Sequence, residues 1–431
     1  MKNNVKQQSI LGLKGRVAAV ILAMLLCISC FPAVYSAAQE IVPTHYYGRS
    51  ALAVLDRADV LLYAYDQIAS GIEQHADEIS LSGDGFSVQR SDLATVYDAY
   101  VNDYPQHFWR SNSYQYSYYG QTVLSFMPDY WIDEADLSEA KNTFEQEVVQ
   151  LLDGVEELEN EFDREKLIHD RLADRVVYAS GENAHNAYGA IVEGKAVCDG
   201  YSRAFQYLLY RAGIQSFVVT GSSINPSTGL AEGHAWNLVR INGEYYHTDL
   251  TWNDQSSGIF YAYFNVSQER IEEDHMIDEK AYSLPEAMSR HDNYFSVYGG
   301  IVENPDIQQI GELLAKGGLS ARIYCTADNY TEFGIWFSEN VAQIAHAAGV
   351  SGAFLYVYRT LGREYDLMLL QPGDVNGDGC VRFADVLLAA KFAAGIQTAN
   401  EYELFLADMN QSGSVDLADV LAIARMAAKI L

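Results

Sequence analysis

Positively charged residues are scarce in this chain of 431 residues. Lys and Arg number 28 against 58 Asp and Glu, so the formal net charge is −30 at pH 7. A surface this acidic repels nucleic acid and anionic membranes. We therefore exclude nucleic acid as a partner, whereas the charge is compatible with calcium binding and with a soluble extracellular protein.

Long apolar runs are almost absent as well. The exception, from Val17 to Phe31, follows a basic segment and precedes the small residues Ser36 and Ala37. This order is typical of a secretory signal peptide, which we place at residues 1–37. The run of about 15 residues is too short to cross a membrane comfortably. The sequence thus predicts a secreted, extracellular protein with no membrane span.

Cysteine is the third scarce residue, with five in the chain. Two of them, Cys27 and Cys30, fall within the predicted signal peptide, which leaves Cys198, Cys325 and Cys380. Three widely spaced cysteines do not form a disulfide framework, even in an exported protein. At least one thiol is therefore free for chemistry.

The remaining sequence divides into four regions, and the chain as a whole is predicted to be α+β. Residues 38–160 are expected to be helical, because residues such as Leu61, Tyr65 and Ile68 recur at roughly helical spacing. The other predicted regions are a core of helices and strands at 161–285, a small α/β module of unknown role at 286–370 and an all-α repeat at 371–431.

Two acidic loops lie 34 residues apart in the C-terminal region, and each leads into a similar amphipathic helix. Calcium prefers six to eight oxygen ligands, which alternate residues of a tight loop can supply. Gly379 and Gly413 stand where such a loop turns sharply. The alternative is two solvated acidic turns, which the repetition in register disfavours. The predicted ligands of two calcium ions, at loop positions 1, 3, 5, 7 and 12, are Asp374, Asn376, Asp378, Cys380 and Asp385 in the first loop, and Asp408, Asn410, Ser412, Ser414 and Asp419 in the second, with position 7 contributing its main-chain carbonyl.

Over residues 373–431 these repeats resemble a type I dockerin. The resemblance implies calcium-dependent folding and docking to a cohesin module on the scaffolding protein of a cellulosome. Loop positions 10 and 11 often carry a Ser-Thr pair that helps to select the partner. Here they are Phe383-Ala384 and Leu417-Ala418, and apolar residues at an exposed helix start fit a protein interface. We expect these four residues to contact the partner.

Cys198 stands at the predicted start of a helix in the core region. The apolar residues Tyr201, Phe205 and Leu208 mark the buried face of this helix, and Gly213 follows its end. Unpaired N–H groups at a helix N-terminus favour a thiolate. Nucleophilic catalysis by cysteine requires that thiolate.

A hairpin places a histidine and a carboxylate together. The strands from His234 to Ile241 and from Glu244 to Asp249 flank Asn242-Gly243, a strong signal for a two-residue turn. The resulting register puts His234 and Asp249 on one face, about 7 Å apart by backbone. A carboxylate there can orient the imidazole and stabilise its cation. A three-residue turn would place them on opposite faces.

Each of these residues also has an ordinary structural interpretation. A cysteine at a helix start is often a small apolar core residue, and a histidine in a strand is often a satisfied core group. The joint pattern is harder to meet by chance. His247 shares the hairpin face and is expected to be a supporting residue, or an alternative base.

Several segments between residues 161 and 265 resemble the transglutaminase-like superfamily of papain-fold thiol enzymes. The strongest are Gly194 to Tyr201, Gly233 to Asn237 and Asp249 to Trp252, in the Cys, His, Asp order of that family. The resemblance implies that Cys198 is the nucleophile, His234 the general base and acid, and Asp249 the residue that orients His234. It implies no cofactor in the catalytic core.

The implied activity is acyl transfer at amide bonds of proteins or peptides. Attack by water on the thioester gives a peptidase or amidase, which we favour by analogy with bacterial members, whereas attack by a lysine amine gives a crosslinking transglutaminase. A non-catalytic docked subunit is an alternative from another class. A carbohydrate-active enzyme would suit a dockerin, but no persuasive pair of catalytic carboxylates stands out among 58 acidic residues.

Overall fold

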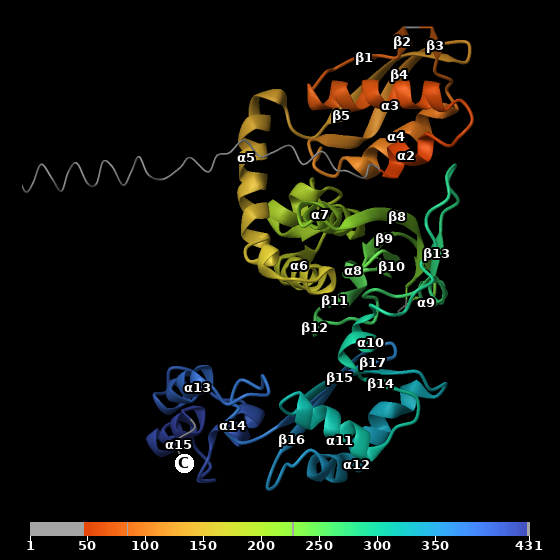
Figure 1. Cartoon of the computed structure of the whole chain (residues 1–431). Helices are drawn as coiled ribbons and strands as arrows, with labels where there is room; N and C mark the ends of the chain where they lie inside the picture. The colour runs from red at the N-terminus through yellow and green to blue at the C-terminus, as the bar shows by residue number, and fades with distance from the viewer. Residues whose placement is uncertain (1–46, 84, 226–227, 429–431) are drawn as a thin grey trace, which may run out of the picture. The chain divides into compact units, whose positions relative to one another are not determined.

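The computed structural model describes residues 47–428, except for 84 and 226–227 (Figure 1). The predicted signal peptide, with Cys27 and Cys30, lies outside the described residues. Within the described part of the chain, no helix combines the length and the apolar character that crossing a membrane requires. The predicted boundaries between the four regions remain predictions.

The N-terminal region is helical in part, and it also contains a sheet that the sequence analysis missed. Its helices are α2 (Tyr47–Leu52), α3 (Ala58–Glu73), α4 (Asp92–Asp103) and α5 (Glu134–Leu151). The sheet has the order β1-β5-β4, with β1 (Ile79–Ser80), β5 (Thr122–Tyr130) and β4 (Arg110–Tyr119), and a small hairpin pairs β2 (Ser82–Gly83) with β3 (Phe86–Ser87). The missed signal was Tyr114, Tyr116 and Tyr118, which alternate with polar residues as strand residues do.

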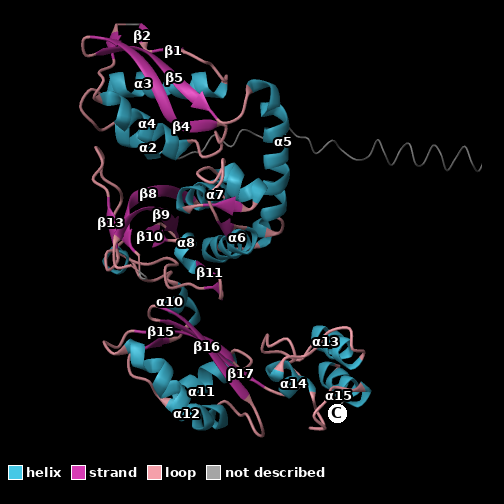
Figure 2. Cartoon of the chain, turned by 180° about the vertical axis from the view of Figure 1, so that it is seen from behind, coloured by secondary structure: helices cyan, strands magenta, loops and turns pink. Residues whose placement is uncertain are grey.

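A four-stranded antiparallel sheet forms the framework of the core region. Its order is β10-β9-β8-β13, with β10 (Glu244–Thr248), β9 (Ala231–Ile241), β8 (Gln215–Ile224) and β13 (His275–Ile277). Helix α7 (Cys198–Arg211) packs against β8 and β9, and α6 (Glu161–Arg175) packs against α7 (Figure 2). Phe205, Leu208 and Leu209 of α7 are fully buried in the same core as Val239 and Tyr246 of the sheet.

The β9–β10 hairpin has the register that its turn predicts. Ile241 pairs with Glu244, and Asn237 pairs with Thr248. Asn242 and Gly243 both have positive φ, 51° and 91°, as a two-residue type I′ turn requires. Asp249 follows directly and caps the N-terminus of the short helix α8 (Leu250–Asn253).

Short elements complete the core region around this sheet. They are η1 (Val155–Glu157), the parallel pair β6 (Val177–Tyr178) and β7 (Lys195–Ala196), the π-helical turn η2 (Gly189–Glu193), the pair β11 (Asp254–Gln255) and β12 (Gly258–Ile259), and α9 (Gln268–Ile271). Strand β7 lies just before α7 in the chain, and its pairing with β6 brings Tyr178 beside Ala196, near the start of that helix.

The module after the core is α/β. Its sheet has the order β14-β15-β17-β16, with β14 (Ile301–Val302), β15 (Ser320–Cys325), β17 (Glu364–Leu370) and β16 (Leu355–Leu361). Its helices are α10 (Tyr294–Tyr298), α11 (Ile307–Lys316), η3 (Tyr330–Glu332) and α12 (Phe333–Ala347). Ile310, Ile323, Phe337 and Leu367 are fully buried in its own hydrophobic core.

The C-terminal region is all-α. It consists of α13 (Phe383–Ala393), α14 (Glu401–Ala407) and α15 (Leu417–Ala427). Helices α13 and α15 pack together over Ala389, Phe392 and Ile423. Each calcium-loop candidate directly precedes one of these two helices.

Candidate active site

Cys198 is the first residue of α7 and is half-buried. The preceding loop comes close to this helix start, because the Val197 N–H donates to the Ala184 carbonyl at 3.0 Å. Gly200 makes the approach possible, since a Cβ there would lie 2.3 Å from the same carbonyl oxygen. The thiol of Cys198 lies near the His234 imidazole and raises the pKa of that ring. The sequence therefore places a cysteine against a histidine at a helix N-terminus.

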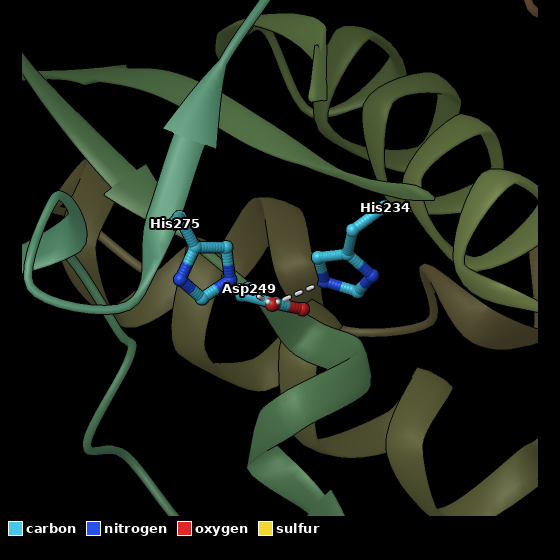
Figure 3. A group of neighbouring side chains, drawn as sticks. All are labelled: His234, Asp249 and His275. Atoms are coloured by element: carbon cyan, nitrogen blue, oxygen red, sulfur yellow. Dashed lines mark hydrogen bonds and ion pairs between the residues drawn. The ribbon is translucent and has the colours of Figure 1, made fainter. Parts of the chain in front are cut away.

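His234 lies between this thiol and a buried carboxylate. Its Nε2 is 2.7 Å from Oδ2 of Asp249, which is fully buried (Figure 3). The other oxygen of Asp249 accepts the Trp252 backbone N–H at 3.1 Å. The structure thus brings together the three predicted residues Cys198, His234 and Asp249 as candidate nucleophile, base and orienting group. Their catalytic roles remain a prediction.

His234 and Asp249 each favour the charged form of the other. Burial lowers the pKa of His234, but the charge and the hydrogen bond of Asp249, with Cys198 adding to them, raise it overall to about 10. Burial raises the pKa of Asp249, yet the charge and hydrogen bond of His234 hold it well below its usual range. His234 is therefore a cation at neutral pH, and a cation beside a helix N-terminus favours a thiolate.

Tyr178 also belongs to this site, although the sequence analysis did not single it out. Its hydroxyl lies close to the backbone N–H of Cys198. Burial raises the pKa of this phenol, as do the neighbouring Cys198 and Glu232, although that N–H lowers it. Because Tyr178 reaches the site through the pairing of β6 with β7, no local sequence signal could have placed it.

His275 is a second missed residue, and it contacts Asp249 on the side opposite His234 (Figure 3). Its Nε2 is 3.1 Å from Asp249 Oδ2. Potential ligand atoms of His234, Asp249 and His275 lie within 4.8 Å of one another, close enough to hold a metal ion. The imidazole–carboxylate separations of 2.7 and 3.1 Å are hydrogen-bond lengths, so we interpret the group as a hydrogen-bonded chain.

His247 does not serve as the alternative base. It is fully buried, its Nδ1 accepts the indole N–H of Trp236 at 3.1 Å, and its Nε2 donates to Gln268 at 2.9 Å. Burial lowers the pKa of His247 to about 4. A neutral ring with both nitrogens engaged is a core residue rather than a proton acceptor.

The two C-terminal loops share one hydrogen-bond pattern. In the first, Asp374 accepts the backbone N–H groups of Asp378 and Gly379 at 3.1 and 2.9 Å, and Asp385 accepts that of Asn376 at 3.0 Å. The second repeats these contacts: Asp408 accepts the N–H groups of Ser412 and Gly413, and Asp419 accepts that of Asn410. Gly379 and Gly413 have φ of 84° and 87°. The predicted ligand residues therefore lie in two equivalent, tightly turned loops.

The first loop also has the electrostatics of a cation site. Burial, with the nearby carboxylates of Asp385 and Asp378, raises the pKa of Asp374 to about 6, although the backbone N–H groups of Gly379 and Asp378 lower it. A bound cation would relieve this crowding, and oxygen-rich donors suit calcium. The role of Cys380 and Ser414 at position 7, as main-chain ligands, remains a prediction.

The predicted partner-binding residues are exposed. Phe383 and Leu417 begin α13 and α15, and they are 76% and 79% exposed. Ala384 and Ala418 follow them and are exposed as well. The two helices thus present equivalent apolar starts to solvent.

Comparison with known proteins defines the class of each part. Residues 149–250 match the transglutaminase-like superfamily, and residues 372–426 match the type I dockerin domain. The chain therefore contains a transglutaminase-like core followed by a type I dockerin domain, as the resemblances implied. The α+β fold class is confirmed. Type I dockerin domains bind calcium.

Solved structures give weaker, partial similarities. A structure described as a TGase is 14% identical, with a TM-score of 0.24, and the match covers 32% of this chain and 44% of that chain. The periplasmic domain of TgpA from Pseudomonas aeruginosa, bound to ethylmercury, is 18% identical, with a TM-score of 0.20 and coverage of 35% and 60%. This chain therefore spans less than two thirds of either structure. No curated protein matches it.

Proposed function

We propose that this protein is a secreted cysteine enzyme that transfers acyl groups from amide bonds of proteins or peptides, and that its dockerin attaches it to a cohesin-bearing scaffold of a cellulosome. The observation that carries the enzymatic part is one chain of contacts. The thiol of Cys198, at a helix N-terminus, raises the pKa of the neighbouring His234, and His234 lies 2.7 Å from the buried Asp249. This is the arrangement that an activated nucleophile, its base and an orienting group require.

The first half of the reaction forms a thioester. The Cys198 thiolate attacks the amide carbonyl, the C–N bond breaks, and His234 gives its proton to the leaving amine. The developing oxyanion accepts the Cys198 backbone N–H. The Tyr178 hydroxyl, which lies close to that N–H at rest, moves aside and becomes the second donor to the oxyanion. Tyr178 is 59% exposed and therefore has room for this movement.

The second half regenerates the enzyme. Neutral His234 takes a proton from water, whose oxygen attacks the thioester, and the C–S bond breaks to give the carboxylic acid and the thiolate. Asp249 stabilises the His234 imidazolium both before acylation and after the attack of water. We favour hydrolysis over crosslinking. An attacking lysine amine would instead give a protein crosslink by the same steps.

Docking depends on the C-terminal domain. Two calcium ions occupy the loops that begin at Asp374 and Asp408. A cohesin module contacts the exposed helix starts at Phe383 and Leu417, and Ala384 and Ala418 lie beside them. This attachment requires secretion of the chain, which the predicted signal peptide at residues 1–37 provides.

The first test is the rate at which iodoacetamide alkylates Cys198, measured from pH 5 to 9. Peptide mapping separates this thiol from Cys325 and Cys380. We expect fast alkylation of Cys198 below pH 7, and a slower reaction in His234→Ala. An ordinary thiol titrates near pH 8.5, so a profile of that kind, unchanged in His234→Ala, would contradict the enzymatic proposal. It would favour the alternative of a non-catalytic subunit docked to the scaffold.

A second experiment separates the possible reactions. Incubation with a denatured protein yields new peptide ends if the enzyme is a peptidase, free ammonia alone if it is a deamidase, and covalent dimers if it is a transglutaminase. Cys198→Ala is the matched control, because it removes only the sulfur. Formation of covalent dimers without new peptide ends would overturn our preference for hydrolysis.

A further inference from the structure

His275 is buried behind the candidate triad. It opens β13, which pairs with β8 at the edge of the sheet opposite β10. Its ring lies 4.9 Å from that of Trp236 and 4.7 Å from that of Trp252, centroid to centroid. In Figure 3 its side chain points at Asp249 from the side opposite His234.

Both ring nitrogens of His275 face carboxylates. Nδ1 is 2.6 Å from Asp274 Oδ1, and Nε2 is 3.1 Å from Asp249 Oδ2. An ionised carboxylate only accepts hydrogen bonds, so each nitrogen must carry a proton. The geometry therefore assigns His275 the charged imidazolium form.

We propose that His275 is a second imidazolium that shares the Asp249 carboxylate with His234, and that it sets the pH range over which His234 keeps its proton. The proposal rests on the proposed function, because His275 acts only through Asp249 and His234. It makes His275 a positioning residue and not a catalytic one.

The surrounding charges are consistent with this assignment. The titratable or charged groups that face His275 are Asp249 at the start of α8, Arg270 of α9 and Asp274 beyond it, Tyr263 before α9, His234 of β9 and His247 of β10. Asp274 is itself held by the Tyr263 hydroxyl at 2.7 Å and by Arg270 at 3.3 Å. Burial lowers the pKa of His275, but the hydrogen bonds and charges of Asp249 and Asp274 outweigh it and raise that pKa overall.

The second cation has a defined effect on the first. Asp249 Oδ2 accepts from both imidazoles, and the rings of His234 and His275 are 5.4 Å apart. A like charge at this distance disfavours protonation of His234, whereas Asp249 favours it. His275 therefore limits how strongly Asp249 holds the proton that His234 must give to the leaving amine.

Two variants test the charge while preserving the packing. His275→Gln keeps a donor to Asp249 but removes the cation. Asp274→Asn keeps the ring and removes the carboxylate that fixes its second proton. The pH profile of Cys198 alkylation has a lower inflection, where the thiol ionises, and an upper one, where the His234 imidazolium loses its proton. In each variant both inflections should move to higher pH, and the upper one should move by about one pH unit. Profiles are recorded from pH 5 to 11 by brief pH-jump mixing with iodoacetamide.

The matched control is His247→Gln, because His247 is another fully buried histidine of the same sheet but is neutral. We expect an unshifted profile, with thermal melting to confirm that all three variants are folded. Folded His275→Gln and Asp274→Asn variants with unshifted profiles would overturn the proposal. Failure of the proposed function is distinguishable, because the wild-type protein itself would then show an ordinary thiol profile.

A direct measurement covers the case in which the variants do not fold. Nitrogen NMR of the full chain with 15N-labelled histidine reports the protonation of each ring. We expect His275 to carry protons on both nitrogens from pH 5.5 to 8. A neutral tautomer at pH 7 would refute the proposal, whatever the behaviour of the variants.

Discussion

The hydroxyl of Tyr178 lies close to the backbone N–H of Cys198, the group to which the proposed mechanism assigns the oxyanion of the substrate. The pairing of β6 with β7 brings the phenol there. Two roles for Tyr178 follow from this contact, that of a second oxyanion donor and that of a gate. They predict opposite effects of removing the hydroxyl.

We expect Tyr178→Phe to slow acylation by an activated ester by about 100-fold, because loss of one oxyanion donor has a cost of this size. The alkylation of Cys198 by iodoacetamide should not change, since that reaction develops no oxyanion. Burst kinetics with a p-nitrophenyl ester measure acylation, and Tyr188→Phe is the control tyrosine. Faster acylation in Tyr178→Phe would instead identify the hydroxyl as a gate.

Glu165 should make the protein less stable as the pH rises. Its side chain is fully buried and bonds to Thr248 and Asn265, and burial raises its pKa to about 8. In the unfolded chain the carboxyl loses its proton near its ordinary pKa of 4.5, whereas the folded state keeps that proton up to about pH 8. The stabilisation that Glu165 provides is therefore complete below pH 4.5 and is lost as the pH rises to about 8.

Glu165→Gln removes that dependence, because the amide keeps the shape of the protonated acid without a charge. We expect the variant to be more stable than the wild type at pH 8.5, by on the order of a few kcal/mol, and to differ little at pH 5. Thermal melting at the two pH values measures the difference. Glu159→Gln, an exposed residue just before α6, is the control. A constant difference at both pH values would show that Glu165 is ionised in the folded state.

The features predictable from the sequence were local. Asn242-Gly243 fixes the register of the hairpin and hence the meeting of His234 with Asp249. Gly213, with φ of 79°, follows the end of the helix that Cys198 begins. The calcium loops repeat at a fixed spacing. In the hairpin and the helix, the residues that give the signal lie about 15 residues or fewer from the structure they determine, and each calcium loop is itself a short local segment.

The features that the sequence analysis missed depend on pairing between distant segments. Tyr178 reaches Cys198 through β6 and β7, and His275 reaches Asp249 only because β13 pairs with β8. The N-terminal sheet was missed because the helical pattern around Ile68 was extended over the whole region. The alternating tyrosines of β4 carry the opposite, two-residue period.

Calcium removal should separate the two functions of the chain. Chelation with EDTA is expected to unfold α13 to α15 and to abolish cohesin binding, because metal binding in such loops is coupled to folding. Alkylation of Cys198 should continue at its normal rate. Calorimetric titration should detect two ions in the wild type and one in Asp374→Ala, with Glu401→Gln, an exposed acid outside the loops, as the control. Loss of alkylation together with docking would show that the two domains are coupled.

Gly221 decides whether β13 can approach the sheet. A Cβ at this position would lie 2.0 Å from the Met276 carbonyl oxygen and 3.1 Å from the Trp236 ring, and the first of these atoms belongs to the backbone. Gly221→Ala should therefore push β13 away from β8 and move His275 off Asp249. We expect a loss of about 1–3 kcal/mol in the free energy of unfolding, as in other overpacked sites.

The control for this substitution is Gly233→Ala in β9, because a Cβ there meets no atom within 4 Å. Denaturant unfolding measures stability, and the pH profile of Cys198 alkylation reports the position of His275. In Gly221→Ala the profile should shift to higher pH in the same direction as in His275→Gln, since both changes withdraw a cation from Asp249. Gly221→Ala could instead have the same free energy of unfolding as the wild type and the same pH profile of Cys198 alkylation. In that case the close contact of β8 with β13 does not exist in solution. The charge on Asp249 would then be balanced by His234 alone.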